Sequence, residues 1–176
     1  MIQIDTREHE KERLRIQKQF DALGIEYVLK KVDEGDYISD RIPGVSVDRK
    51  KNLAELAYNC GRDCTRYCAE IRRAADKGVH LIFLCENGGS IRELADVRNW
   101  KNPRLAESPL AISGERLHKI MSSISRKYGC EYRFCRKSET GRVIAELLGE
   151  IETVKKIETG GKDIYVPTKN KPESGG

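Results

Sequence analysis

The chain contains 176 residues, of which 35% are charged, and its formal net charge is +5. This length suffices for one domain with a real hydrophobic core but not for two large ones. The mildly basic balance is compatible with a polyanionic partner without requiring one. Because no apolar run is long enough to span a membrane and the N-terminus does not look like a signal peptide, we expect a cytoplasmic protein without a membrane partner.

Hydrophobic periodicity predicts strands and helices that alternate along the chain. In chain order these are a strand from Ile2, a helix over 9–23, strands over 25–32 and 45–50, a helix over 52–76, a strand over 79–85, helices over 90–99 and 113–128, a strand over 131–135 and a helix over 138–148. This order is typical of a three-layer α/β fold, in which helices cover both faces of a sheet.

The first predicted helix carries an apolar stripe and a stop signal. We expect Leu14, Phe20 and Leu23 to form the stripe that faces the core. Gly24 follows at the position where a left-handed residue commonly ends a helix.

Later helices begin at residues that can cap them. Asn52 can cap the long helix over 52–76, although Gly61 interrupts the pattern. Ser90, with an acidic residue three positions later, is predicted to cap the next helix through a capping box, and Ser113 is predicted to cap the helix after it.

The strand over 45–50 places an acid and a lysine on one side of the sheet. Because side chains alternate along a strand, Ser46, Asp48 and Lys50 should share one face. Asp36, at the end of the preceding acidic turn, can approach that face because a Pro-Gly turn lies between the two segments.

This constellation indicates phosphodiester hydrolysis. Mg²⁺ prefers oxygen ligands and is commonly held by one or two carboxylates together with a substrate phosphate. A lysine beside the ion can orient the attacking water or stabilise the charge that develops on the phosphate. The alternative for Asp48 and Lys50 taken alone is an ordinary ion pair on an exposed strand.

Three segments each contain an aspartate, and they are Ile4-Asp5-Thr6-Arg7-Glu8, Gly35-Asp36-Tyr37 and Val47-Asp48-Arg49-Lys50. Together they resemble the nuclease domain of the XPF-type structure-specific endonucleases, in which Val-Asp-x-Arg-Glu, Gly-Asp-Tyr/Phe and Val-Glu-Arg-Lys elements follow one another at similar distances. The resemblance continues through Asn59-Cys60-Gly61-Arg62 and the apolar strand that begins at Val79. The part from Ser113 to Gly149 is similar to small prophage and bacterial members.

The resemblance implies a restriction-endonuclease-like PD-(D/E)xK core with a central mixed sheet flanked by helices, and Mg²⁺ or Mn²⁺ as the cofactor. The implied catalytic residues are Asp5, Glu8, Asp36, Asp48, Arg49 and Lys50, and the implied metal ligands among them are Asp5, Asp36 and Asp48. Two positions depart from the family pattern. Asp48 stands where the family usually has Glu, and Ala54 stands where it often has Asp. Whether the neighbouring Glu55 replaces that Asp is left open by the sequence.

Basic and aromatic residues outside these segments are candidate DNA contacts. The predicted DNA-binding residues are Arg7, Arg62, Arg66, Trp100, Lys101 and Arg104. The alternatives are solvated charges for the helical arginines and a structural anchor for the tryptophan.

Cys60, Cys64 and Cys68 recur every four residues and would share one helical face. A zinc site built on these three cysteines is one interpretation, but no Cys-x-x-Cys pair or Cys/His quartet is present. Buried free thiols in a reducing compartment are the interpretation that we favour.

Taken together, the sequence predicts a nuclease domain over residues 1–149 and a loosely ordered C-terminal tail over residues 150–176. The predicted function is metal-dependent endonucleolytic hydrolysis of DNA, branched or flapped, in recombination or repair. The alternative is a catalytically silent DNA-binding partner of a nuclease. Beyond DNA, the family resemblance implies a homodimer or a separate DNA-binding partner.

Overall fold

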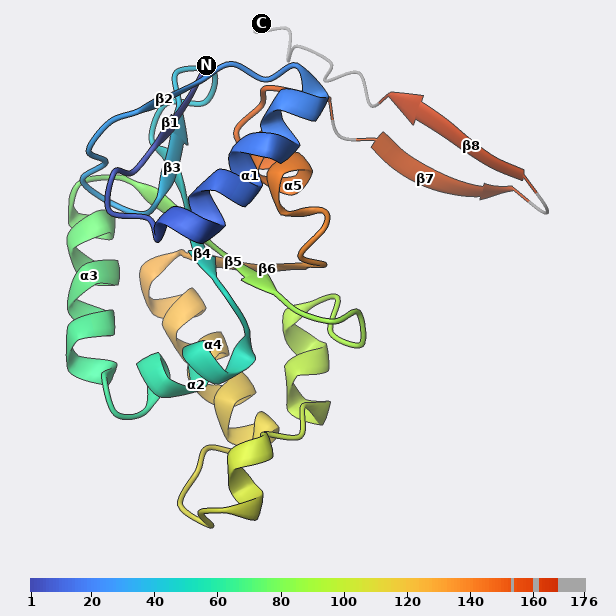
Figure 1. Ribbon diagram of the computed structural model, residues 1–176. Helices are drawn as coiled ribbons and strands as arrows, with labels where there is room; N and C mark the ends of the chain where they lie inside the picture. The colour runs from blue at the N-terminus through green and yellow to red at the C-terminus, as the bar shows by residue number, and fades with distance from the viewer. Residues whose placement is uncertain (153, 160–161, 168–176) are drawn as a thin grey trace, which may run out of the picture.

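The computed structural model describes residues 1–152, 154–159 and 162–167. Its centre is a six-stranded mixed sheet with the strand order β2-β1-β3-β4-β5-β6 (Figure 1). The strands are β1 (Ile2–Ile4), β2 (Tyr27–Leu29), β3 (Tyr37–Ser39), β4 (Val45–Lys50), β5 (His80–Glu86) and β6 (Glu131–Cys135). β3 runs antiparallel to β1 and β4, whereas β4, β5 and β6 are parallel, so the carboxyl ends of these three strands meet at one edge of the sheet.

Helices cover both faces of this sheet (Figure 1). The α-helices are α1 (Glu10–Leu23), α2 (Leu53–Cys60), α3 (Cys64–Asp76), α4 (Gly114–Tyr128) and α5 (Thr140–Leu147), and the 3₁₀ helices are η1 (Leu94–Asn99) and η2 (Pro103–Ala106). Helices α1 and α5 pack on one face, and α2, α3, α4 and η1 pack on the other. The predicted three-layer α/β architecture with a mixed central sheet is therefore confirmed.

The central strand β5 joins two hydrophobic cores. Its side chains alternate, so that Leu81 and Phe83 lie in the core beneath α2, α3 and α4, whereas Ile82 and Leu84 lie in the core beneath α1 and α5. This explains why β5 reads as a continuous apolar run, because a parallel strand that is covered on both faces needs apolar side chains on both. Each such side chain stabilises the fold by about 1.5–3 kcal/mol on burial.

The single helix predicted over 52–76 is wrong, because two helices occupy this segment. Asn52 caps α2 as expected and accepts a hydrogen bond from the backbone N–H of Glu55 at 2.9 Å. The chain then turns at Gly61, where a Cβ atom would lie 2.9 Å from Cδ1 of Ile112 and 3.1 Å from the carbonyl oxygen of Ala57. Glycine therefore allows the loop before α4 to pack closely against the break between α2 and α3.

The predicted cap at Ser90 is also wrong. The helical segment begins later, at Leu94, and Glu93 caps it in a capping box with Asp96. The Asp96 carboxylate accepts hydrogen bonds from the backbone N–H groups of Arg92 and Glu93, at 2.9 and 3.2 Å. The serine and glutamate spacing resembles a capping box, but the competing Glu93 and Asp96 pair supplies two reciprocal bonds and fixes the start of η1.

The stripe predicted for α1 is only partly correct. Phe20 is fully buried, but Leu14 and Leu23 are 48% and 41% exposed, and Ile16 takes the second core position. Ile16 and Phe20 are four residues apart and therefore lie on one helical face, whereas Leu14 is rotated away from it. The helix ends as predicted, with Gly24 at φ 66°.

Other predicted elements agree with the structure. Ser113 caps α4 and accepts a hydrogen bond from the backbone N–H of Arg116 at 3.2 Å. The strand predicted over 25–32 is present but shorter, as β2. In the described part of the chain, no helix is long and apolar enough to cross a membrane.

The segment predicted as a tail contains a β-hairpin. Strands β7 (Val154–Thr159) and β8 (Lys162–Pro167) pair antiparallel. The predicted loose stretches at Gly160-Gly161 and 169–176 lie outside the described residues. The domain boundary at Gly149 stays a prediction.

Candidate active site

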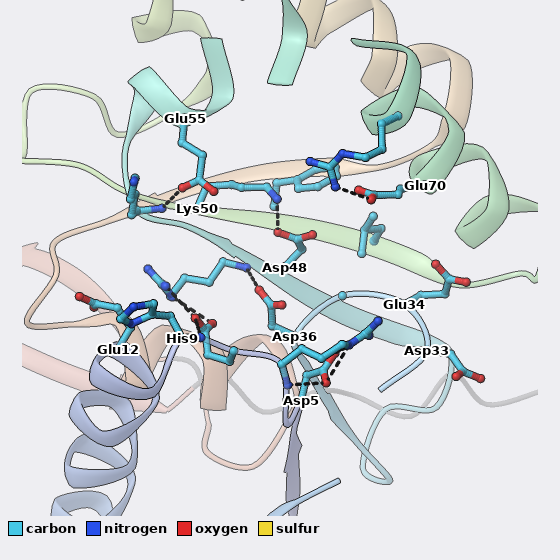
Figure 2. A pocket seen from close by; sticks show the side chains of 18 of the residues that line it. Asp5, His9, Glu12, Asp33, Glu34, Asp36, Asp48, Lys50, Glu55 and Glu70 are labelled. Carbon is cyan, nitrogen blue, oxygen red and sulfur yellow. Dashed lines mark hydrogen bonds and ion pairs between the residues drawn. The ribbon is translucent and has the colours of Figure 1, made fainter. Parts of the chain in front are cut away.

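A cavity of about 640 Å³ lies at the carboxyl end of β4 (Figure 2). It is lined by the N-terminal segment after β1, by the acidic loop before β3, by the end of β4, by the first turn of α2 and by one face of α3. Segments from the N-terminus to α3 therefore meet at the edge of the sheet where the three parallel strands end. Such edges are the usual location of ligand sites in α/β proteins.

Backbone hydrogen bonds fix Asp36 at this edge. Its N–H donates to the carbonyl oxygen of Val47 at 2.9 Å, and its own carbonyl oxygen accepts from the N–H of Asp5 at 2.8 Å. The preceding Gly35 has φ 76°, and a Cβ atom there would overlap Oγ of Ser46. Glycine at this position therefore permits the close approach of the loop to β4 that delivers Asp36 to the cavity.

Asp36 and Asp48 form a carboxylate pair without enough positive charge nearby to balance it. Burial raises the pKa of Asp36 well above its usual range, and the negative charges of Asp48 and Glu8 raise it further. The backbone N–H of Arg49 donates to Oδ2 of Asp36 at 2.8 Å and only partly offsets these effects. Two carboxylates held together in this way form a ready site for a cation.

Lys50 lies on the same face of β4 as Asp48, as the alternation of the strand predicted. Its Nζ is 2.6 Å from Oδ1 of Asp48. It also lies 5.9 Å from the ring centroid of Tyr67 and 5.5 Å from that of Phe83, within the range of cation–π attraction. Burial lowers the pKa of Lys50, but the attraction of Asp48 raises it more, so the ammonium group stays charged at neutral pH.

Glu8 and Arg49 face each other on the opposite side of β4. Arg49 donates from Nη2 to Oε1 of Glu8 at 2.9 Å and from Nε to Oε2 at 3.2 Å. The hydroxyl of Tyr37 donates to the same carboxylate at 3.2 Å. Both predicted catalytic residues are therefore engaged in a buried bidentate ion pair, which holds the N-terminal segment against the sheet.

This ion pair extends to Glu86, which sequence reasoning did not single out. Oε2 of Glu86 lies 3.6 Å from Nη1 of Arg49, and its Oε1 accepts from the hydroxyl of Thr140 at 2.7 Å and from the guanidinium of Arg15. A charged residue at the end of a continuous apolar run was the only signal in the sequence that could have indicated Glu86.

Asp5 is held mainly by Arg7. Oδ1 of Asp5 accepts from the backbone N–H of Arg7 at 3.0 Å, and Oδ2 accepts from its Nε at 2.8 Å. Burial raises the pKa of Asp5, but these bonds and the positive charge of Arg7 outweigh it, and the pKa lies below its usual value. Asp5 thus reaches the cavity with its charge already paired.

The donor set of the cavity suits a hard divalent cation. Asp36, Asp48 and Glu55 present carboxylate oxygens, which Mg²⁺ and Mn²⁺ prefer. Within the described residues, no three acidic, histidine or cysteine side chains already stand close enough together to hold an ion. The side chains therefore fit a site in which two carboxylates bind the ion and water or phosphate supplies the other ligands.

Glu55 is placed to contribute a further carboxylate. It projects from the first turn of α2 into the cavity, and its Oε2 accepts from the backbone N–H of Lys51 at 2.8 Å. Whether it replaces the family's acidic residue, which is absent at Ala54, stays a prediction.

Only some of the predicted DNA-binding residues line the cavity. Arg7 and Arg66 do, and Arg66 also donates from Nη1 to Glu70 at 2.8 Å. Trp100 is half-buried against the core beneath α4. The four residues that do not line this cavity are Arg62, Trp100, Lys101 and Arg104. Their contact with DNA stays a prediction.

The cysteines remain free thiols. Cys60, Cys85, Cys130 and Cys135 are buried, and Sγ of Cys64 lies 3.6 Å from Sγ of Cys68. Burial raises the pKa of Cys60 to about 12, which keeps that thiol protonated at neutral pH. In the described part of the chain no three cysteines are arranged as metal ligands, and Cys64 and Cys68 are only half-buried, so the choice between free thiols and zinc stays a prediction.

Comparison with known proteins gives one family and a set of similar structures. A family model described as the ERCC4 domain matches residues 4–147, which is most of the chain. The search of curated proteins found no match.

Two similar structures are of XPF from Aeropyrum pernix. One has 18% sequence identity and a TM-score of 0.60, and the match covers 84% of this chain and 62% of that one. The other, a complex with DNA, has 19% identity and a TM-score of 0.58, with 85% and 63% covered. The chain thus spans less than two thirds of the length of these relatives. At this level of identity the likeness shows the fold, and the predicted restriction-endonuclease-like core is confirmed.

Proposed function

Because the chain belongs to the ERCC4 domain family, we propose that it is a divalent-metal-dependent endodeoxyribonuclease. The observation that carries this proposal is the pair of half-buried carboxylates, Asp36 and Asp48, with the ammonium group of Lys50 beside them at the carboxyl end of β4. A surface ion pair would leave Asp48 and Lys50 exposed, whereas both lie within the cavity and Lys50 is largely buried.

Asp36 and Asp48 are the proposed ligands of Mg²⁺ or Mn²⁺, and Asp5 and Glu55 are acidic groups within reach of its water shell. When bound, the ion would polarise the phosphoryl oxygen and lower the pKa of a coordinated water. The repulsion between Asp36 and Asp48 supports this assignment, because a divalent cation between them would offset it.

The chain's own residues supply the remaining parts of hydrolysis. Lys50 remains protonated and can contact a non-bridging oxygen of the phosphate, where negative charge develops in the transition state. A water oxygen bonds to phosphorus, the bond from phosphorus to one ester oxygen breaks, and the released oxygen takes a proton. The Glu8–Arg49 pair keeps the N-terminal segment and β4 together, and therefore acts by positioning.

The substrate that we propose is branched or flapped DNA in recombination or repair. The complex of XPF from Aeropyrum pernix with DNA supports DNA as the ligand of a related fold. A homodimer, a separate DNA-binding partner, a cytoplasmic location and a prophage or bacterial origin remain predictions.

The test is cleavage of labelled single-stranded, duplex, flap and Holliday-junction DNA with Mg²⁺, with Mn²⁺ and with a chelator. The informative variants are Asp48→Asn and Lys50→Met. Their matched controls are Glu115→Gln and Lys119→Met, which alter an exposed ion pair on α4 whose members lie 2.8 Å apart. We expect metal-dependent cutting that both site variants lose and both controls keep.

The second candidate function is a catalytically silent DNA-binding partner. The pairing of Arg7 with Asp5 favours it, because Asp5, which the family resemblance implies as a metal ligand, is already neutralised. Binding of the DNA panel without cutting under every metal condition would establish this alternative and reject the nuclease.

A further inference from the structure

A second cavity, of about 280 Å³, lies at the carboxyl ends of β5 and β6, and its lining is separate from that of the active-site cavity. It is formed by the loop that follows β5 and by the turn that precedes α5. Because β4, β5 and β6 are parallel, this cavity lies at the same edge of the sheet as Lys50. Adjacent strands are about 4.8 Å apart, so β6 lies about 10 Å from β4 along the sheet.

Two arginines of this second cavity form no close ion pair within the described residues, although the charge of Arg92 acts on Asp96. Arg92 and Arg136 are both exposed, and in the part of the chain that the structure describes neither guanidinium lies within 4.0 Å of a carboxylate oxygen. Glu139 also lines the cavity, but its Oε2 accepts from the backbone N–H of Arg136 at 3.2 Å. Among the described residues, the lining thus carries two guanidinium groups that form no close ion pair and one carboxylate that is hydrogen-bonded to the backbone.

The amide of Asn87 adds a buried donor. Its Nδ2 is shielded from solvent and has no hydrogen-bond partner among the described residues. Leaving such a donor unsatisfied costs free energy, so a ligand that accepts a hydrogen bond from it would be favoured. The backbone of Asn87 is fixed, because its N–H donates to the carbonyl oxygen of Cys135 at 2.8 Å.

Gly89 brings the loop close to one of the arginines. Its φ is 104°, and a Cβ atom there would lie 3.4 Å from Nε of Arg136 and 3.7 Å from Nη2. The guanidinium of Arg136 therefore rests against the glycine backbone at the mouth of the cavity.

These groups match the chemistry of a phosphate. Guanidinium groups bind phosphate oxygens through paired N–H donors, and an amide N–H completes a third contact. We propose that Asn87, Arg92 and Arg136 bind one backbone phosphate of the DNA strand that enters the active-site cavity. This inference rests on the proposed function. A separation of about 10 Å corresponds to the rise of about three base pairs, so the site would hold the strand close to the scissile bond.

The first test compares DNA binding by the full chain and by two double variants. Arg92→Gln/Arg136→Gln removes the cations of the cavity, and Arg116→Gln/Arg126→Gln removes two arginines from α4 as the control. Affinity for a labelled flap DNA is measured by fluorescence anisotropy, with Ca²⁺ present to prevent cutting, over about 50–200 mM salt. We expect the cavity variant to bind about tenfold more weakly, with a salt slope smaller by about 1, and the control to be unchanged.

A third variant separates binding from folding. Asn87→Leu replaces the unpartnered amide with an apolar group of similar shape, so thermal stability should not fall while DNA affinity does. In parallel, the side-chain amide signals of Asn87 are followed by ¹⁵N NMR during addition of a short oligonucleotide, of the same oligonucleotide with neutral methylphosphonate linkages, and of inorganic phosphate. We expect the charged oligonucleotide to shift these signals and the neutral one to leave them in place.

The outcomes distinguish this proposal from the proposed function. If the wild-type chain cuts DNA while the cavity variants keep its affinity and salt slope, the phosphate site is rejected and the nuclease stands. If inorganic phosphate shifts the Asn87 signals and the oligonucleotide does not, the cavity is a site for free phosphate and the proposal is overturned. A wild-type chain that neither binds nor cuts any DNA rejects the proposed function itself.

Discussion

The two sides of β4 carry the same kinds of charged residues but balance them differently. On one side, Arg49 contacts the carboxylates of Glu8 and Glu86, and Arg15 contacts Glu86 as well. On the other side, Asp36 and Asp48 share the single nearby ammonium of Lys50. Consecutive residues of β4 thus belong to two sets: Arg49 to a network in which positive and negative charges balance, and Asp48 and Lys50 to a cluster with excess negative charge.

This difference separates the residues that stabilise the fold, around Arg49, from the residues proposed to bind a cation, Asp36 and Asp48. A buried ion network stabilises the fold only when its charges are matched and hydrogen-bonded. Around Arg49 the charges are matched and Glu8 is hydrogen-bonded, whereas Nη1 of Arg49 and Oε2 of Glu86 form an ion pair at 3.6 Å without a hydrogen bond. A cluster that must receive a cation has to keep excess negative charge, and it therefore destabilises the protein without that cation. Such local conflicts are expected at functional sites rather than in the framework.

The largest expected effect is the separation of activity from stability at Asp36. Asp36→Asn removes one of two repelling carboxylates, so metal-dependent cutting should fall by about 10⁴-fold while the melting temperature stays the same or rises. Cleavage rates and thermal melts in a chelator measure the two effects. Asp40→Asn, an exposed aspartate in the turn after β3, is the control and should change neither. A clear fall in melting temperature with Asp36→Asn would remove the contrast between the two sides of β4.

On the balanced side, Arg49→Met should destabilise the fold by about 3–5 kcal/mol, because it leaves Glu8 and Glu86 buried without their shared cation. Urea unfolding at neutral pH measures the free energy of unfolding. The same change made in a Glu8→Gln background should reduce the free energy of unfolding by less, since residue 8 then carries no charge that Arg49 would have to neutralise. Equal costs in both backgrounds would show that packing, not charge, explains the loss.

The loop that delivers Asp36 gives a smaller effect. Gly35→Ala should destabilise the protein by about 2 kcal/mol, because the residue has φ 76° and its new Cβ would clash with Oγ of Ser46. Gly24→Ala is a matched control, since Gly24 has φ 66° but no neighbouring atom lies within 4 Å of the place that a Cβ would occupy, and it should cost about 1 kcal/mol. Similar losses in the two variants would show that backbone conformation alone matters at Gly35.

The sequence could predict which side chains share one face of β4 because its signals are local. Period-two alternation places Asp48 and Lys50 together whatever the rest of the fold does, and a glycine before Asp36 marks the tight approach of its loop. Assigning a metal role to these residues required the family resemblance, because a lone Asp-x-Lys pair is common. The predicted placement of these side chains is therefore confirmed, because their spacing is encoded within a few residues, whereas their metal role stays a prediction.

The rest depends on contacts between distant segments. Glu86 gains its role only when α1 brings Arg15 to it and α5 brings Thr140, which are 71 and 54 residues away in sequence. The stripe predicted for α1 was partly wrong for a different reason, because the spacing of its residues does not fit one helical face. Leu14 and Phe20 are six residues apart and cannot share a helical face, and only packing against the sheet shows that Ile16 is the buried partner.

The smallest expected effect tests an ion pair at the rim of the balanced network. Burial raises the pKa of Glu12, but hydrogen bonds from Lys137 and Arg15 outweigh it and lower the pKa from 4.5 to about 2. Because the folded-state pKa lies below the unfolded one, this carboxylate stabilises the fold above pH 4.5 and loses that contribution as the pH falls toward 2. Glu12→Gln should therefore cost about 1 kcal/mol at pH 7 and progressively less in acid. Urea unfolding of wild type and variant, at pH 7 and again in acid, isolates this contribution, because the effects of all other titrating groups cancel in the difference between the two proteins. A difference that does not shrink in acid would show that Glu12 acts through shape or packing, and that only the core of the network around Arg49 is electrostatic.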